Sequence, residues 1–449
     1  MKNKTRAIFN SRIGAILATA GSAVGLGNIW RFPYTLGENG GAAFLLIYIL
    51  CVIILGLPVM LSEFYIGHKT HSNATGAFKL LAPKSKWSLI GYNGILGTCF
   101  IFGFYSVIAG WTLEYFTHSM IGGFEGKSPL ELQTYFNNFS SSIFRPLLWT
   151  SVFVFITHLI VVSGVKRGVE KAAKILMPLL FVILIMMSIQ SLSLENASKG
   201  LLFLFNPDFS KITATVVLNA MGQAFFSLSV GICCLATFAS YFDNQTNLQQ
   251  AALQVTMIDT LVALLAGIII FPAVFSFGIA PTTGPKLVFI TIPQVLIQLP
   301  FGNIWAFIFF LLLALAALTS TISLLEVPTV YIEEEFHTSR RTASRIASLF
   351  IWVLGILCTL SFSVLADIKL FDLTFFELLD FVTAKLMLPL GGLFICLFMN
   401  KQVKKEDLRQ VMTNHGNTVF YFFNTFVFFV RWVAPILIIL VFLNQFGLI

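Results

Sequence analysis

The residues best suited to do chemistry in this chain lie in one stretch near its start, GSAVGLGNIWRFP at positions 21–33. Gly21, Gly25 and Gly27 each weaken a helix by roughly 1 kcal/mol relative to alanine, so the stretch predicts an unwound turn. Such a turn presents backbone carbonyl oxygens, and Asn28 adds a side-chain carbonyl beside them. These oxygen ligands suit a small hard cation. The glycines alone would equally suit close helix packing, but packing has no need of Asn28.

Two further polar stretches interrupt apolar segments. The first is the run Thr319, Ser320 and Thr321. A single helical hydroxyl usually bonds the carbonyl one turn earlier, whereas three in succession favour a binding role. The second is GQAFFSLSVG at 222–231, where serines and a glycine interrupt an apolar helix. Two interrupted helices are typical of transporters whose site lies near the middle of the membrane.

The segments that must position these residues are long and apolar. Of 449 residues, 57% are hydrophobic and 11% are charged, which indicates an all-α polytopic membrane protein. The apolar runs predict 11 transmembrane helices, near 13–36, 42–68, 89–121, 147–164, 169–191, 213–240, 250–277, 302–335, 342–362, 374–400 and 418–446. We expect one transporter domain, 1–449, in which 13–191 and 213–400 are five-helix inverted repeats and 418–446 is an additional helix.

The net charge of +8 does not indicate nucleic-acid binding, because the basic residues form short clusters between the apolar segments. Five clusters fall in alternate loops, and the positive-inside rule makes their side cytoplasmic. The sequence therefore predicts a multi-pass plasma-membrane protein with a cytoplasmic N-terminus and an extracytoplasmic C-terminus. The first cluster precedes the first helix and consists of Lys2, Lys4, Arg6 and Arg12.

Enzymatic activity is not expected. The six histidines are scattered over loops and helix ends without a nucleophile or metal constellation. The six cysteines lie in apolar segments, where they are expected to be packed free thiols. We expect no organic cofactor, and the sequence leaves the oligomeric state open.

The broken first helix, the 222–231 stretch and the hydroxyls at 319–321 together resemble the neurotransmitter:sodium symporter family, particularly its bacterial amino-acid transporters. The resemblance covers essentially the whole chain. It implies a leucine-transporter-like fold, sodium-driven transport, and an external helical hairpin near 278–293.

The resemblance also implies two sodium ions. The first would be bound by the carbonyl of Ala23 and the side chains of Asn28, Ser227 and Asp259. The second would be bound by the carbonyls of Gly21, Val24 and Ala316 and the hydroxyls of Thr319 and Ser320. In both sets, all the ligands are oxygen atoms.

Chloride is expected to be unnecessary. By the resemblance, Asp259 stands where most members have asparagine, and Ala263 stands where chloride-dependent members have serine. An aspartate already supplies the negative charge that chloride would bring. The resemblance therefore implies a relic of an anion site at Tyr48, Gln223, Ser227 and Asp259. Proton uptake by Asp259 on sodium release would add proton counter-transport.

The substrate is expected to be an amino acid. Gly25 has no side chain where the family's monoamine transporters carry an aspartate, which leaves room for a substrate carboxylate. By the resemblance, Tyr105 binds that carboxylate and Phe226 covers it. The implied binding residues are Ala23, Gly25, Leu26, Gly27, Ile101, Tyr105, Phe226, Ser227, Ser229, Ile232, Ser320 and Leu324. Their mostly apolar character favours a neutral aliphatic or aromatic side chain.

Charged residues near the helix ends are expected to form gates. The resemblance pairs Arg31 with Asp380 outside and Arg6 with Glu334 inside. The alternative for the arginines and for Glu334 is that they extend toward the membrane surface without a partner. Two more carboxylates within apolar segments, Glu63 and Glu326, are interpreted as structural partners of unwound backbone.

These expectations combine into a sodium-coupled symporter that takes up a neutral amino acid by alternating access. Two alternatives stay open on the sequence. One is a sodium-independent amino-acid exchanger of the same superfamily, against which Thr319 and Ser320 argue. The other is a sensor that binds an amino acid without transporting it.

Overall fold

The computed structural model describes residues 6–278 and 288–445, and every regular element in these ranges is a helix. Nine helices of the described chain are long and apolar enough to cross a membrane. They are Ala42–Thr70 (α3, a π turn and α4), Ser88–Met120 (α6), Phe144–Val162 (α8), Val165–Leu192 (a π turn and α9), Leu248–Ser276 (α13), Gly302–Glu335 (α15), Arg340–Leu360 (α16), Phe375–Gln402 (α17, a π turn and α18) and Phe423–Leu443 (α20, a π turn and α21).

The first predicted span is a bent pair. α1 (Arg12–Ala23) is followed by a π-helical turn (Gly27–Arg31) and α2 (Phe32–Glu38), and the two halves meet at 47°. Counted as one span, the pair brings the spans of the described chain to ten. The predicted all-α membrane architecture is confirmed.

The predicted span 213–240 is divided more deeply than the first. α11 (Ala214–Ser227) and α12 (Cys234–Ala239) are separated by six non-helical residues, so neither half has the length of a span. This is why the structure supports ten spans where the sequence predicts 11, and the total of 11 stays a prediction. The division into inverted repeats also stays a prediction.

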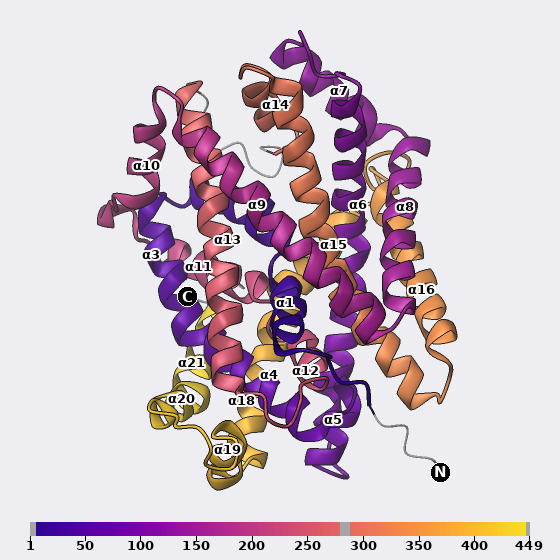
Figure 1. Ribbon diagram of the computed structural model, residues 1–449, viewed down its shortest axis with the longest axis vertical. Coiled ribbons are helices and arrows are strands. Elements are labelled where there is room, and N and C mark those ends of the chain that lie inside the picture. Colours follow the sequence, from indigo (N-terminus) through magenta and orange to yellow (C-terminus); the bar gives the residue numbers. More distant parts are fainter. Residues whose placement is uncertain (1–5, 279–287, 446–449) are drawn as a thin grey trace.

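Shorter helices cover the two ends of the bundle (Figure 1). At one end lie α7 (Pro129–Ser141) and α14 (Thr291–Leu296). At the other end lie α5 (Ala74–Leu81) and α19 (Lys405–Met412). Most of the predicted external hairpin 278–293 falls outside the described residues.

The core of the bundle surrounds α1, which packs against α9, α13 and α15 (Figure 1). α6 and α15 are largely buried, whereas α8 and α9 present large apolar side chains such as Phe155 and Ile189 on the outer surface. An apolar outer face is what a membrane requires of a helical bundle. All six cysteines lie in described segments and are buried and free, as expected.

Candidate functional site

The break in the first span exposes backbone at the centre of the bundle. α1 ends at Ala23, and Val24 adopts an extended conformation before the π turn begins at Gly27. A Cβ at Gly25 would lie 2.6 Å from the Tyr105 hydroxyl oxygen and would also collide with Ser320. Glycine at position 25 therefore has two effects. It lets Ser320 and Tyr105 approach the backbone closely, and it weakens the helix at the break.

The oxygens predicted for the second sodium site converge on this break. Thr319 and Ser320 each donate a hydroxyl hydrogen bond of 3.1 Å to the carbonyl oxygen of Val24. The Thr319 hydroxyl also lies 2.9 Å from the carbonyl oxygen of Ala316. A Cβ at Gly21 would lie 3.3 Å from Thr319 Cβ, so α1 and α15 are in contact here. All five predicted residues are thus neighbours.

The residues predicted for the first sodium site also meet, around the carboxylate of Asp259. The Asn28 amide donates to Asp259 Oδ1 at 2.7 Å and to Ser227 Oγ at 3.0 Å. Ser227 donates to Asp259 Oδ2 at 2.8 Å, and the Tyr48 hydroxyl lies 3.1 Å from Ser227 Oγ. The fourth predicted residue, Ala23, lines the adjoining cavity.

A cavity lies beside the break and contains nearly the whole predicted amino-acid site. The main-chain N–H of Leu26 donates to the Tyr105 hydroxyl oxygen at 2.6 Å, which fixes the tyrosine over the break. The cavity is lined by Ser22, Ala23, Gly25, Gly27, Ile101, Tyr105, Phe226, Ser229, Ile232, Ser320, Leu324 and Leu388. Two predicted residues are not part of this lining. Leu26 instead bonds Tyr105 through its main-chain N–H, and the Ser227 hydroxyl donates to Asp259.

The second break is held by left-handed backbone and by a buried carboxylate. Ser229, Gly231 and Cys233 have φ values of 52°, 91° and 57°. Glu63 accepts the N–H of Gly231 at 2.6 Å and that of Ala236 at 3.2 Å. The structural role expected of Glu63 is therefore confirmed.

The same expectation for Glu326 is wrong. Its carboxylate accepts hydrogen bonds from Tyr241 at 2.7 Å and from Arg340 at 2.5 Å. Arg340 begins α16, so this pair joins the end of α15 to the next helix. A buried carboxylate is stabilised by whichever donor packing brings near, and here that donor is a cation.

The ion pair predicted for the outer gate is present, whereas its role as a gate stays a prediction. Arg31 Nη1 lies 3.2 Å from Asp380 Oδ1, and the Arg31 guanidinium lies 4.2 Å from the centroid of the Phe226 ring. Phe226 lines the cavity, so the ion pair lies directly over its aromatic wall. The pair and the ring together close this side of the site.

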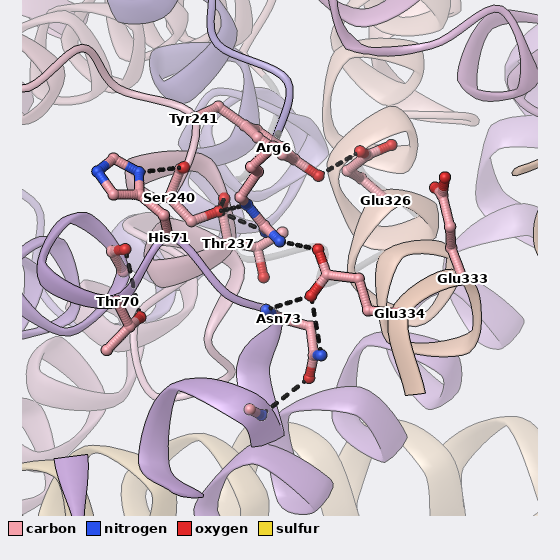
Figure 2. A network of polar contacts seen from close by, with 12 residues as sticks. Arg6, Thr70, His71, Asn73, Thr237, Ser240, Tyr241, Glu326, Glu333 and Glu334 are labelled. Atoms are coloured by element: carbon pink, nitrogen blue, oxygen red, sulfur yellow. Dashed lines mark hydrogen bonds and ion pairs between the residues drawn. The ribbon is translucent and has the colours of Figure 1, made fainter. Parts of the chain in front are cut away.

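The ion pair predicted for the inner gate is also present, at the end of the bundle that carries α5 (Figure 2). Arg6 and Glu334 make an ion pair, and Arg6 Nε donates to Ser240 Oγ at 2.9 Å. Glu334 also accepts from the main-chain N–H and the side-chain amide of Asn73, at 2.9 and 3.0 Å. Both predicted ion pairs are thus present in the same structure.

Sequence reasoning missed four residues of this arrangement. Ser22 and Leu388 line the cavity, while Ser240 and Asn73 hold the inner gate. Asn73 could have been identified from the sequence, because an asparagine before an apolar helix predicts an N-cap. Asn73 is the N-cap of α5. Leu388 carried none, since a leucine in an apolar span is indistinguishable from a packing residue.

Comparisons with known proteins agree with this geometry. A model of the sodium:neurotransmitter symporter family matches residues 6–129 and 130–448. The sodium-dependent transporter YhdH of Bacillus subtilis is 39% identical over 98% of this chain and 97% of its own length. A sodium-dependent transporter of Haemophilus influenzae is 34% identical over 99% of both chains.

A solved structure is similar as well. The crystal structure of MhsT in complex with L-phenylalanine has a TM-score of 0.91 and 42% sequence identity, over 98% of this chain and 99% of that one. The predicted leucine-transporter-like fold is therefore confirmed. This chain is a sodium-dependent transporter that belongs to the sodium:neurotransmitter symporter family.

Proposed function

We propose that the protein takes up a neutral hydrophobic or aromatic amino acid together with sodium, by alternating access and without chloride. One observation carries the proposal. At the break, the carbonyl of Val24 meets the Thr319 and Ser320 hydroxyls, and two residues later the N–H of Leu26 meets the Tyr105 hydroxyl. Cation-binding oxygens and a carboxylate-binding tyrosine thus share one buried segment, which couples the two solutes by proximity.

The walls of the cavity support an amino acid as the substrate. Gly25 and Tyr105 both line the cavity, where a substrate carboxylate could accept a hydrogen bond from the tyrosine hydroxyl. Ile101, Ile232 and Leu324 form an apolar wall suited to a hydrophobic side chain. The similar protein MhsT was solved with L-phenylalanine, which is a ligand of this class.

Chloride independence is supported by the surroundings of Asp259. Its carboxylate is fully buried and accepts hydrogen bonds from Asn28 and Ser227, with the Tyr48 hydroxyl at 3.5 Å. The donors that could hold a small anion are therefore turned toward a fixed negative charge. A chloride ion added there would be repelled by the aspartate.

Two sodium ions per cycle are proposed, one beside Asp259 and one beside Thr319. At about 2.3 kcal/mol per charge per 100 mV and about 1.4 kcal/mol per tenfold gradient, two ions supply roughly 7 kcal/mol. We place the Arg6 and Glu334 gate on the cytoplasmic side in the plasma membrane, because basic clusters recur in the loops at that end.

The deciding experiment is uptake of labelled neutral amino acids into proteoliposomes. An inward sodium gradient is compared with an equal potassium gradient, and chloride is replaced by gluconate in a parallel series. Accumulation that requires sodium and ignores chloride supports the proposal. Accumulation in potassium would indicate an exchanger, and sodium-dependent binding without accumulation would indicate a sensor.

A further inference from the structure

A large cavity lies outside the transport site, at the end of the bundle that carries α5 and α19. Its volume is about 400 Å³, and it lies between the end of α4, the segment after α12 and the turn after α19. Cavities of this size hold small-molecule ligands in other proteins. We call it the histidine cavity. Its polar lining includes His68, Lys69, His71, Asn244, Asn414 and His415.

The lining is rich in hydrogen-bond donors and in groups that carry positive charge. The rings of His68 and His71 lie 5.6 Å apart, and His415 opens to solvent. The nearby carboxylate of Asp407 is already bound to Lys69 at 2.8 Å. Within the described part of the chain, no group of three or more His, Cys, Asp or Glu residues could hold a metal ion. The chemistry therefore favours an anion.

The contacts of His68 and His71 fix which ring nitrogens carry hydrogen. His68 Nε2 lies 3.2 Å from the carbonyl oxygen of Asp243, and His71 Nδ1 lies 2.9 Å from that of Ser240. A carbonyl can only accept, so both nitrogens must carry hydrogen. His71 Nε2 lies 3.0 Å from Asn244 Oδ1. This contact is a hydrogen bond if Nε2 also carries hydrogen, or if the Asn244 amide is turned over so that its nitrogen donates.

The histidine cavity shares backbone with the inner gate (Figure 2). Ser240 accepts from His71 through its carbonyl and from Arg6 through its hydroxyl, at 2.9 Å in each case. Two residues after His71, the N–H of Asn73 donates to Glu334 at 2.9 Å. Whatever fixes His71 therefore restrains both sides of the ion pair that closes the gate.

We propose that the histidine cavity binds a phosphate group, and that bound phosphate holds the inner gate closed. A phosphate presents several strong acceptor oxygens and up to two negative charges, which match imidazoles and an ammonium arranged on more than one wall. The group can come from a free phosphate anion or from a phospholipid headgroup at the membrane surface. Regulation rests on the proposed transport function, whereas binding does not.

Binding is tested first, by equilibrium dialysis of labelled inorganic phosphate against the full-length protein in detergent. We expect saturable binding that weakens about tenfold in His68→Gln and in His415→Gln, since each removes one imidazole from the lining. His337→Gln is the matched control, because His337 is exposed and does not line the cavity. Absence of saturable binding, or equal binding by all variants, overturns the proposal.

Gate control is tested with proteoliposomes of neutral lipid that contain phosphate or gluconate on the side of the inner gate. We expect phosphate to slow sodium-driven uptake several-fold in the wild type and not in His68→Gln or His415→Gln. A parallel series with phosphatidate in the vesicles identifies a headgroup as the source. Binding without any effect on uptake in either series overturns the gate coupling. Binding by a protein that does not transport would refute the proposed function alone.

Discussion

Ser320 donates its hydroxyl hydrogen to the carbonyl oxygen of Val24 at 3.1 Å, which joins the intact helix α15 to the break in the first span. The contact unites a residue of the predicted cavity with a residue of the predicted sodium site. If sodium binds at Val24 as proposed, a change in its occupancy would act directly on the wall of the proposed amino-acid site. The proposed coupling therefore depends on the hydroxyls of α15.

Replacing Thr319 by valine should raise the sodium concentration needed for half-maximal amino-acid binding. The change keeps the shape of the side chain and removes one oxygen, so we expect an increase of roughly tenfold. Sodium titration of labelled amino-acid binding to the purified protein measures it. Thr321→Val is the control, because the Thr321 hydroxyl faces Thr157 at 3.0 Å. Equal effects of both changes would contradict the sodium assignment.

Replacing Asp259 by asparagine should make transport depend on chloride. The substitution keeps the hydrogen-bonding shape beside Ser227 and removes the fixed negative charge. We expect uptake in gluconate to fall about tenfold, with partial recovery in chloride, because the neighbouring donors can then hold an anion. Uptake with and without chloride measures the change. Equal uptake by the variant in both salts would refute the role given to Asp259.

Replacing Gly25 by alanine should abolish amino-acid binding. The new Cβ would collide with Ser320 and lie 2.6 Å from the Tyr105 hydroxyl. Overpacking of about 1–3 kcal/mol corresponds to a loss of up to about 100-fold. Gly222→Ala is the control, because nothing lies within 4 Å of its added Cβ. Binding assays on both variants decide the matter, and normal binding by Gly25→Ala would place the substrate elsewhere.

Replacing Glu334 by glutamine should weaken the inner gate. The ion pair with Arg6 is lost, although the glutamine can still accept from Asn73. We expect steady-state accumulation to fall roughly tenfold, equivalent to about 1.4 kcal/mol, while amino-acid binding in detergent changes little. Glu335→Gln is the matched control, because Glu335 pairs with the exposed Lys79. A similar fall in the control would show that net charge, not the gate, is responsible.

The contact between Asp407 and α4 should make stability depend on pH. Partial burial tends to raise the pKa of the Asp407 carboxyl, but hydrogen bonds from Lys69 and Tyr65 outweigh it, so the pKa is lowered. Because the folded pKa lies below the unfolded value near 3.9, the stabilisation is present above about pH 4 and is lost as pH falls through the folded pKa.

Asp407→Asn tests this dependence. The variant should be less stable than the wild type by at most about 1 kcal/mol, because the pair is partly exposed. Thermal unfolding in detergent should show a constant difference between pH 5 and pH 8 that disappears in stronger acid. A difference that grows on acidification would contradict the lowered pKa.

Local features of the chain were sufficient to predict most of the fold. Apolar length located the spans, and 302–335 agrees with Gly302–Glu335 at both ends, with Pro300 and Gly302 marking its start. Helix propensity predicted the break at 21–27. It did not predict that the second break would lie at 228–233, where left-handed backbone at Ser229 and Cys233 is held by Glu63.

The sequence by itself determined the membrane architecture, the two interrupted helices and, through the family resemblance, the residue types of the proposed sites. Only the tertiary structure decided which further distant groups meet. Asn73 donates to Glu334 across 261 positions, and Glu326 binds Arg340 instead of unwound backbone. The physical reason is that propensity and hydropathy act along neighbouring residues, whereas a buried polar group is satisfied by whichever partner helix packing brings within hydrogen-bond distance.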